Sequence, residues 1–367
     1  MKLLDCCKSI SDGDWIESED QSSSGIRLIQ TGNIGVTQYL DKQERAKYIS
    51  AETFNRLKCS PVVGGDVLVS RLPDPIGRAC IVPYDIGPAI TAVDCSIIRV
   101  NTDIVDPKYL VYFTDSDSYK SQIASYSTGT TRKRISRKNL EKISISVPSK
   151  DKQIQIIDNL DKINFLINSL WNCLLLFDDL IRSRFIEMFG DPISYEDVNE
   201  LPMLGDVCKL KAGVFVKASD ISNAPEKELY PCYGGNGLRG YVSTYTNDGS
   251  FPIIGRQGAL CGNVRLVEGK FHATEHAVVV DLNGKYNTKW FAQYLNLLDL
   301  NRHATGAAQP GLSVGKIGLL HLKIAERKRQ DEYSILVDQI NKSKLAIQKS
   351  IDELEILKKS LMQEYFG

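Results

Sequence analysis

Five residues, His272-Ala273-Thr274-Glu275-His276, match the spacing of a zinc-protease motif in which two histidines bind the metal and a glutamate activates water. That chemistry needs a helix, because a helix brings both imidazoles to one face. The next residues, Ala277-Val278-Val279-Val280-Asp281, favour a strand, and no distal third ligand is evident. We therefore predict a turn that leads into a strand, with His276 partly packed and no metal bound.

Two glycine-containing stretches resemble nucleotide-binding loops. The stretch 311–316 has one residue too few between its glycines, and no Ser or Thr follows Lys316 to bind Mg²⁺. The stretch 233–240 contains Gly-x-Gly but lacks the preceding apolar strand and the following helix of a cofactor fold. The tetrapeptide of a DNA amino-methyltransferase is not found either. We expect no catalytic residue and no cofactor in this chain.

The chain contains an internal repeat that must position whatever chemistry it has. Residues 128–190 align without a gap with residues 305–367, and 12 of the 63 aligned positions are identical. The apolar positions keep their register even where identity is lost, and both copies end in Glu-x-Phe-Gly. Two copies of one unit suit a target that also has two parts.

Each copy of the repeat contains one long predicted helix, because apolar residues recur at alternating steps of four and three, the heptad seam of a coiled coil. The seam residues are Ile156, Leu160, Ile163, Ile167, Leu170, Leu174, Phe177 and Ile181 in the first copy and Tyr333, Val337, Ile340, Ile347, Ile351, Leu354 and Leu361 in the second. Lys344 and Lys358 interrupt the second seam, which favours one particular pairing. An apolar stripe needs a cover, so we expect the helices to pair as an antiparallel coiled coil about 60 Å long.

Length and composition indicate two globular domains in a mixed α/β (α+β) fold. The chain has 367 residues, of which 43% are hydrophobic and 25% charged, with zero net charge. We predict a first domain at 1–148, a helix at 149–190, a second domain at 191–325 and a helix at 326–367. No apolar run reaches the roughly 20 residues that span a bilayer, and the N-terminus turns polar too early for a signal peptide. Nine cysteines without a Cys-x-x-Cys motif favour reduced thiols in the cytoplasm.

The two globular parts also resemble each other. Asp5-Cys6-Cys7-Lys8 has a counterpart in Asp206-Val207-Cys208-Lys209, and Lys108-Tyr109-Leu110 has one in Lys289-Trp290-Phe291. Ile76-Gly77-Arg78 likewise resembles Ile254-Gly255-Arg256. A basic strip, 132–138, carries five cations and no acid. Point charges beside small hydrogen-bond donors suit phosphate contacts, although a solvated loop before a helix fits these residues equally well.

The order domain, helix, domain, helix, with Thr-Gly-x-x-x-x-x-[Ile/Leu]-Ser before each helix, resembles the specificity subunit of type I restriction-modification systems. The resemblance covers the whole chain, and its most specific parts are blocks 127–147 and 304–324 and the Ile-Gly-Arg turns. It implies two target recognition domains, each reading one half of an asymmetric bipartite DNA site. It also implies that the helices space the domains and dock two modification (methyltransferase) subunits and, through them, restriction (helicase-nuclease) subunits. Catalysis would then belong to these partners, with S-adenosylmethionine, ATP and Mg.

Loop side chains would contact the DNA in such a protein. Our candidates for base contacts, each equally compatible with a structural role, are Gln30, Thr31, Asn33, Arg71 and Arg78 in the first domain and Tyr233, Asn236, Arg239, Arg256 and Gln257 in the second. Phosphate contacts are expected from Arg132, Lys133, Arg134 and Lys138. The matching turn of the second domain, Ala307-Ala308-Gln309-Pro310-Gly311, has no cation, so Arg302 or Lys316 is expected to substitute.

Two other classes stay open on these residues. The chain would be a scaffold if its helices bind only proteins, and a self-contained nuclease or protease if the purified chain shows metal-dependent turnover that is lost when His272 or Glu275 is changed.

Overall fold

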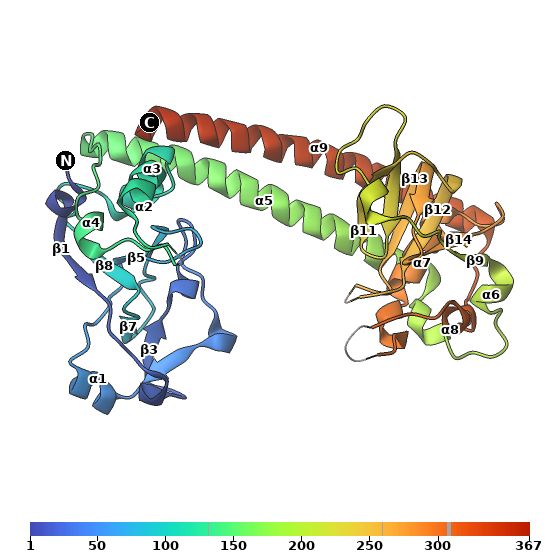
Figure 1. The fold of residues 1–367 in the computed structure, drawn as a ribbon, viewed down its shortest axis with the longest axis horizontal. Coiled ribbons are helices and arrows are strands. Elements are labelled where there is room, and N and C mark those ends of the chain that lie inside the picture. Colours follow the sequence, from blue (N-terminus) through green and yellow to red (C-terminus); the bar gives the residue numbers. More distant parts are fainter. Residues whose placement is uncertain (131, 259, 307–309) are drawn as a thin grey trace. The chain divides into compact units, whose positions relative to one another are not determined.

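The computed structural model describes residues 1–130, 132–258, 260–306 and 310–367. The chain divides into two compact units, the first made of residues 1–169 and 350–367 and the second of residues 170–349. Two helices of 40 residues, α5 (Lys150–Phe189) and α9 (Arg327–Phe366), dominate the fold (Figure 1). Each unit therefore contains the beginning of one long helix and the end of the other.

The first unit contains two sheets of four strands. The first sheet has the order β1 (Cys7–Asp12), β8 (Cys95–Val100), β5 (Val67–Ser70) and β6 (Ala79–Ile81). The second has the order β2 (Gln21–Ser22), β4 (Lys47–Ile49), β3 (Ile26–Ile29) and β7 (Ala89–Thr91). All neighbours are antiparallel except β3 and β7, which run parallel.

The helices of the first unit begin where a side chain can accept a hydrogen bond from the first turn. Ser50, Asp106, Ser116 and Ser136 do so for α1 (Ala51–Leu57), α2 (Pro107–Phe113), α3 (Asp117–Tyr126) and α4 (Arg137–Leu140). Short 3₁₀ turns fill the loops: η1 (Leu3–Cys6), η2 (Ser18–Asp20), η3 (Thr31–Asn33) and η4 (Gln43–Arg45).

The second unit contains one sheet of six strands. Its order is β11 (Gly237–Val242), β10 (Tyr230–Gly234), β13 (Val264–Ala273), β12 (Asn247–Gly255), β14 (Ala277–Asp281) and β9 (Lys209–Ala212). The helices are α6 (Leu204–Val207), α7 (Thr288–Leu297) and α8 (Val314–Gly318), with 3₁₀ turns η5 (Pro192–Tyr195), η6 (Ala218–Asp220) and η7 (Leu300–His303).

The two units share a topology even though their sheets are divided differently. The start of β13 pairs with β12 as β6 pairs with β5, and the end of β13 runs parallel to β10 as β7 runs parallel to β3. The single strand β13 of the second unit therefore corresponds to the two short strands β6 and β7 of the first unit. The loop 82–88 between β6 and β7 accounts for the division of the first unit into two sheets.

Within each unit the long helices run antiparallel. In the second unit Asp178 pairs with Lys344 at 2.5 Å, whereas further along α5 the carbonyl oxygen of Met188 accepts a bond from Arg329 at 2.7 Å. Partners on α9 thus move towards its beginning as α5 advances. In the first unit Asn159 Nδ2 donates to the hydroxyl of Tyr365 at 3.0 Å.

The predicted seam is the inner face of this pairing. All seam residues are buried or half-buried; the most buried are Ile156, Leu160, Ile163, Tyr333, Ile340 and Ile351. Lys344, which interrupts the seam, reaches Asp178. The expected mixed fold, with two long helices paired antiparallel, is therefore confirmed.

The core of each unit joins a long-helix end to the globular part. In the first unit Phe366 of α9 packs against Tyr109 and Phe113 of α2, with ring centroids 5.2 and 6.1 Å apart. In the second unit Phe189 of α5 packs against Trp290 of α7 at 5.7 Å. The repeated Glu-x-Phe-Gly ending thus places an aromatic anchor against a helix of the globular part, an arrangement that buries large apolar areas.

No helix in the described part of the chain is long and apolar enough to cross a membrane. All nine cysteines are free thiols, and Cys173 is the exposed one.

Candidate nucleic-acid interface

Equivalent main-chain contacts lie near the start of both globular parts. The amide of Leu3 donates to the carbonyl of Ile143 at 2.7 Å, and the amide of Leu204 donates to that of Leu320 at 2.8 Å. Four residues after each leucine a cysteine thiol, Cys7 or Cys208, bonds back to the leucine carbonyl at 3.0 and 3.3 Å. The predicted similarity of these two segments is confirmed.

A buried glutamine fastens each long helix to the globular part beside it. In the first unit Gln153 Oε1 accepts the amide of Asp106 at 2.8 Å, just before α2. Its Nε2 donates to the carbonyls of Ile104 and Pro148 at 3.0 and 2.9 Å. We call this arrangement the glutamine latch; it satisfies buried groups that would otherwise be costly to leave unpaired.

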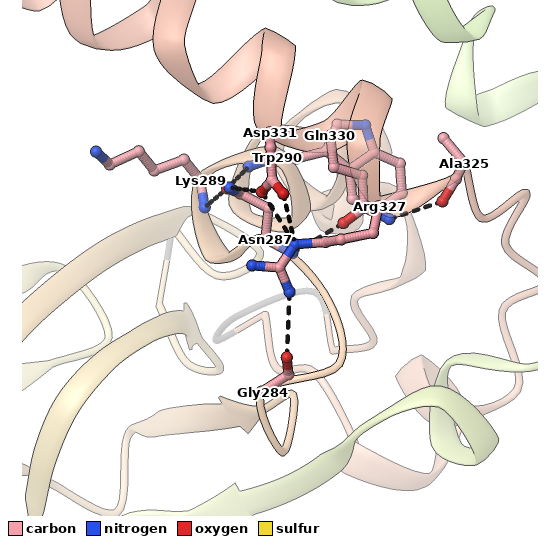
Figure 2. Close-up of polar contacts among 8 residues, drawn as sticks. All are labelled: Gly284, Asn287, Lys289, Trp290, Ala325, Arg327, Gln330 and Asp331. Carbon is pink, nitrogen blue, oxygen red and sulfur yellow. Dashed lines mark hydrogen bonds and ion pairs between the residues drawn. The ribbon is translucent and has the colours of Figure 1, made fainter.

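The second unit has the same latch (Figure 2). Gln330 Oε1 accepts the amide of Asn287 at 2.8 Å, and its Nε2 donates to the carbonyl of Ala325 at 2.8 Å. Beside it, Arg327 reaches Asp331 at 2.9 Å and the carbonyl of Gly284 at 3.1 Å.

Ion pairs accompany both latches. Lys108 reaches Asp161 at 2.6 Å, and Lys289 reaches Asp338 at 2.5 Å. These roles were not predicted, but the signal was present, because Gln153 and Asp161 are identical to Gln330 and Asp338 in the aligned repeat.

The predicted equivalence of the two Ile-Gly-Arg turns was wrong. The main-chain amide of Arg256 donates to the carbonyl of His276, and the carbonyl of Arg256 accepts the amide of Leu312. In the first unit the equivalent bonds are made by Arg71, not by Arg78. The amide of Arg71 donates to the carbonyl of Asp94, and its carbonyl accepts the amide of Ile135. The three letters agree by coincidence, because Gly255 ends strand β12 whereas Gly77 lies in the turn before β6.

Three of the predicted base-contacting residues of the first unit are used by the fold. Asn33 is buried, accepts the amide of Gln30 at 2.9 Å and donates to the carbonyl of Leu40 at 2.9 Å. Arg71 is buried, donates to the carbonyl of Val93 and pairs with Asp12 at 3.3 Å. The third is Arg78.

Arg78 clamps two loops together. Its guanidinium donates to the carbonyl of Ile34 at 2.6 Å and that of Thr31 at 2.9 Å, and to those of Leu72 and Pro75 at 3.1 and 2.9 Å. Burial lowers the pKa of this guanidinium from its ordinary value. The N–H groups of Arg78 therefore donate to carbonyls of the protein itself rather than to an external ligand. The side chains of Gln30 and Thr31 stay half-buried on one of these loops.

Four of the five cations in the basic strip of the first unit are open to solvent. Arg132, Lys133, Arg134 and Lys138 are all exposed. Arg134 lies 3.8 Å from Asp94, an ion pair that leaves half of its side chain accessible. By contrast, Arg137 is half-buried between Glu141 and Asp12, at 3.4 and 4.0 Å. The structure thus presents the four cations that we predicted for phosphate contacts.

The second unit brings three predicted residues together. Asn236, Arg239 and Gln257 are exposed and line one hollow of about 310 Å³. Tyr233 lies elsewhere, with its ring edge-on to Phe271 at 5.9 Å. Arg256 is half-buried, and its Nε has no hydrogen-bond partner within the described ranges.

The two cations expected to substitute for the basic strip differ. Arg302 is bound to the buried carboxylate of Glu196 and to the carbonyl of Leu298, so its charge is largely used within the protein. Lys316 is exposed on α8. Residues 307–309 of the compared turn lie outside the described residues.

The His272–His276 stretch (272–276) does not form a helix. His272 lies near the end of β13 and His276 immediately precedes β14. His272 Nε2 lies 3.1 Å from the carbonyl oxygen of Val214, and His276 Nε2 lies 3.0 Å from Glu275. The predicted turn into a strand is confirmed, and the two imidazoles have separate partners.

Comparison with solved structures shows a shared fold. Over 100% of this chain, the S subunit of a type I restriction-modification system from M. genitalium superimposes with a TM-score of 0.59 at 15% identity, covering 95% of that chain. A chain from a solved structure concerning the assembly of a type I R-M system gives 0.62 at 14% identity, covering 96%.

Curated relatives match over part of their length. The EcoprrI type I restriction enzyme specificity subunit of Escherichia coli is 42% identical over 158 residues, which are 43% of this chain and 38% of that protein. A putative type I specificity subunit of Haemophilus influenzae is 30% identical over 113 residues, 30% of this chain and 29% of that protein. The alignments thus span well under half of either relative.

A family model described as the type I restriction modification DNA specificity domain matches residues 1–170 and 199–355. These two stretches cover most of the chain, and each contains one globular part and the start of the long helix that follows it. The chain therefore belongs to the family of type I restriction modification DNA specificity domain proteins.

Proposed function

We propose that this chain is the DNA-recognition (specificity) subunit of a type I restriction-modification complex and has no catalytic centre of its own. The observation that carries the proposal is the double match to a DNA specificity domain, once on each globular part together with the start of the helix that follows it. Two domains of this kind on one chain suit a DNA site with two halves.

We further propose a division of labour along the chain. Residues 1–148 and 191–325 act as target recognition domains, each reading one half of an asymmetric bipartite site. The paired helices, 149–190 and 326–367, set the spacing between the halves. The glutamine latches support this division, since a spacer can fix a distance only if each end is rigidly attached.

DNA contact is supported by the exposed polar groups of the two units. Arg132, Lys133, Arg134 and Lys138 offer charges to backbone phosphates in the first unit, where such contacts fix position without reading sequence. In the second unit Asn236, Arg239 and Gln257 offer the side chains that pair with base edges.

Docking of two modification subunits, and through them restriction subunits, is proposed to use the long helices. Large apolar side chains stay exposed on the α5 portion of the second unit: Trp171, Leu175, Leu176 and Leu180. An exposed apolar patch of this kind is typical of a protein interface. S-adenosylmethionine, ATP and Mg would then act on those partners.

Salt dependence of DNA binding tests the proposal. Changing Arg132, Arg134 and Lys138 together to Ala should weaken binding to all duplexes, because a phosphate that is no longer neutralised by the protein keeps its condensed counterions. We expect the slope of log affinity against log salt to flatten by about 0.9 for each such phosphate. The measurement is a titration of the full chain with labelled duplex at several salt concentrations.

A variant with Lys328, Lys342 and Lys349 of α9 changed to Ala removes the same charge from exposed positions and should leave the slope unaltered. Failure of the unmodified chain to bind any duplex, even at low salt and with a modification subunit present, would favour the scaffold alternative. Loss of sequence preference with an unaltered slope would instead make the three cations base readers.

A further inference from the structure

The hollow of the second unit lies where three segments meet: the turn between β10 and β11, the residues that follow β12, and the turn before β14. It is lined by Gly234, Gly235, Asn236, Arg239, Gln257, Gly258 and His276. Its volume is about 310 Å³. The hollow is thus built by loops at one end of the sheet.

Glycine keeps the hollow open. A Cβ on Gly235 would lie 2.9 Å from the carbonyl oxygen of His276, closer than real Cβ atoms approach a neighbour. Gly258 has a φ of +86°, which strains any other residue, and nothing lies within 4 Å of the place its Cβ would take. Main chain therefore forms part of the wall, and a flat ligand edge can come close to it.

Three side chains that line the hollow are free to bind. Across the ranges that the structure describes, no hydrogen bond or ion pair is found for the side chains of Asn236, Arg239 or Gln257. All three are exposed. Together they present amide and guanidinium groups, with no lysine and no hydroxyl among the lining residues.

His276 forms one wall of the hollow, and Glu275 positions it. Glu275 Oε1 lies 3.0 Å from Nε2 of the imidazole, and the carbonyl oxygen of His276 accepts the amide of Arg256 at 3.0 Å. The second ring nitrogen, Nδ1, has no hydrogen-bond partner in the described part of the chain. His276 is therefore held both by its main-chain carbonyl and by its imidazole ring.

We propose that this hollow takes the major-groove edge of a purine at one position, or two adjacent positions, of the DNA half-site read by the second unit. Asn and Gln bind adenine through N6 and N7, and Arg binds guanine through O6 and N7, so the free groups all favour purines. His276 is a specificity-determining residue here, because it shapes the wall against which that edge rests. The inference rests on the proposed function, since it presumes that DNA reaches this unit.

Selection from a pool of randomised duplexes tests the assignment. The full chain, with a modification subunit where tight binding needs one, is compared with Gln257→Ala, Arg239→Ala and His276→Ala. We expect each variant to lose purine preference by about tenfold at the same or neighbouring positions, with the rest of the selected site unchanged. Lys285→Ala, an exposed change beyond the far end of β14, should select the original site.

A second variant separates readout from folding. Gln257→Glu keeps the shape of the side chain but removes its donors, and a carboxylate accepts from the amino group of cytosine. We expect preference at that position to move from purine towards cytosine, a gain that a misfolded protein cannot show.

The outcomes are distinguishable. If the unmodified chain enriches no sequence, the proposed function fails and takes this inference with it. If it enriches a site but the hollow variants select that site unchanged, or alter positions scattered over both halves, the hollow is not a base-reading site, and the proposed function stands.

Discussion

The loop after β3 in the first unit and the loop after β10 in the second occupy equivalent places but use their polar residues differently. Main-chain hydrogen bonds establish the equivalence. The amide of Ala92 donates to the carbonyl of Ile29 at 2.9 Å, and the amide of Thr274 donates to the carbonyl of Tyr233 at 2.8 Å. In the first unit the loop is closed by Asn33 and Arg78, whereas in the second it borders an open hollow.

One topology can therefore serve two kinds of contact. The first unit satisfies its own carbonyls with Arg78 and presents charge elsewhere, on the exposed side chains of Arg132, Lys133, Arg134 and Lys138. The second unit leaves Asn236, Arg239 and Gln257 unbound at the hollow. The two halves of a DNA site would then be held with a different balance of phosphate and base contacts.

The largest effect should come from Arg78→Ala, with Arg239→Ala as its counterpart in the second unit. Arg78→Ala removes the four hydrogen bonds that the charged guanidinium donates, and it leaves loop carbonyls without a donor. We therefore expect the free energy of unfolding of the first unit to fall by about 3 kcal/mol. Arg239→Ala should change stability by no more than about 0.5 kcal/mol, because the side chain is exposed. Urea unfolding, with hydrogen exchange to assign the unit, measures both.

Equal losses for these two variants would show that both arginines are structural, and the contrast between the loops would disappear.

The glutamine latches should give a smaller and more even effect. Gln153→Ala and Gln330→Ala each leave a part-buried main-chain amide, at Asp106 and Asn287, without its partner, which should cost about 1–3 kcal/mol. Gln153 makes one more hydrogen bond than Gln330, so its loss should be the greater. Urea unfolding of the full chain is again the measurement, with Gln155→Ala at an exposed position of α5 as the control.

A change confined to one of the two latch variants would contradict the equivalence of the units. It would mean that Gln153 and Gln330, although identical in the repeat, do not contribute equally to stability.

Much of the fold could be predicted from the sequence because the repeat constrains it. Helix positions follow a periodicity that survives sequence divergence, and the seam residues of both helices are buried or half-buried. The stretch 272–276 could be predicted as a turn that leads into a strand, because β-branched residues follow it. Local patterns of this kind are visible along the chain.

The roles of single arginines could not be predicted in this way. Arg78 bonds to carbonyls more than 40 residues away, and nothing in its neighbours shows that those carbonyls need donors. The shared letters of the two Ile-Gly-Arg turns misled for the same reason, since the true counterpart of Arg256 is Arg71, which only the hydrogen bonds identify. Long-range main-chain contacts decide whether an arginine supports the fold or stays available.

The most direct measurement inserts seven residues, in register, into both α5 and α9 and maps the methylated sites of the reconstituted complex. Seven helical residues add about 10.5 Å, so the unread gap between the two half-sites should lengthen by roughly three base pairs while both half-sites stay the same. An unchanged gap, with both half-sites still recognised, would contradict the claim that the paired helices set the spacing.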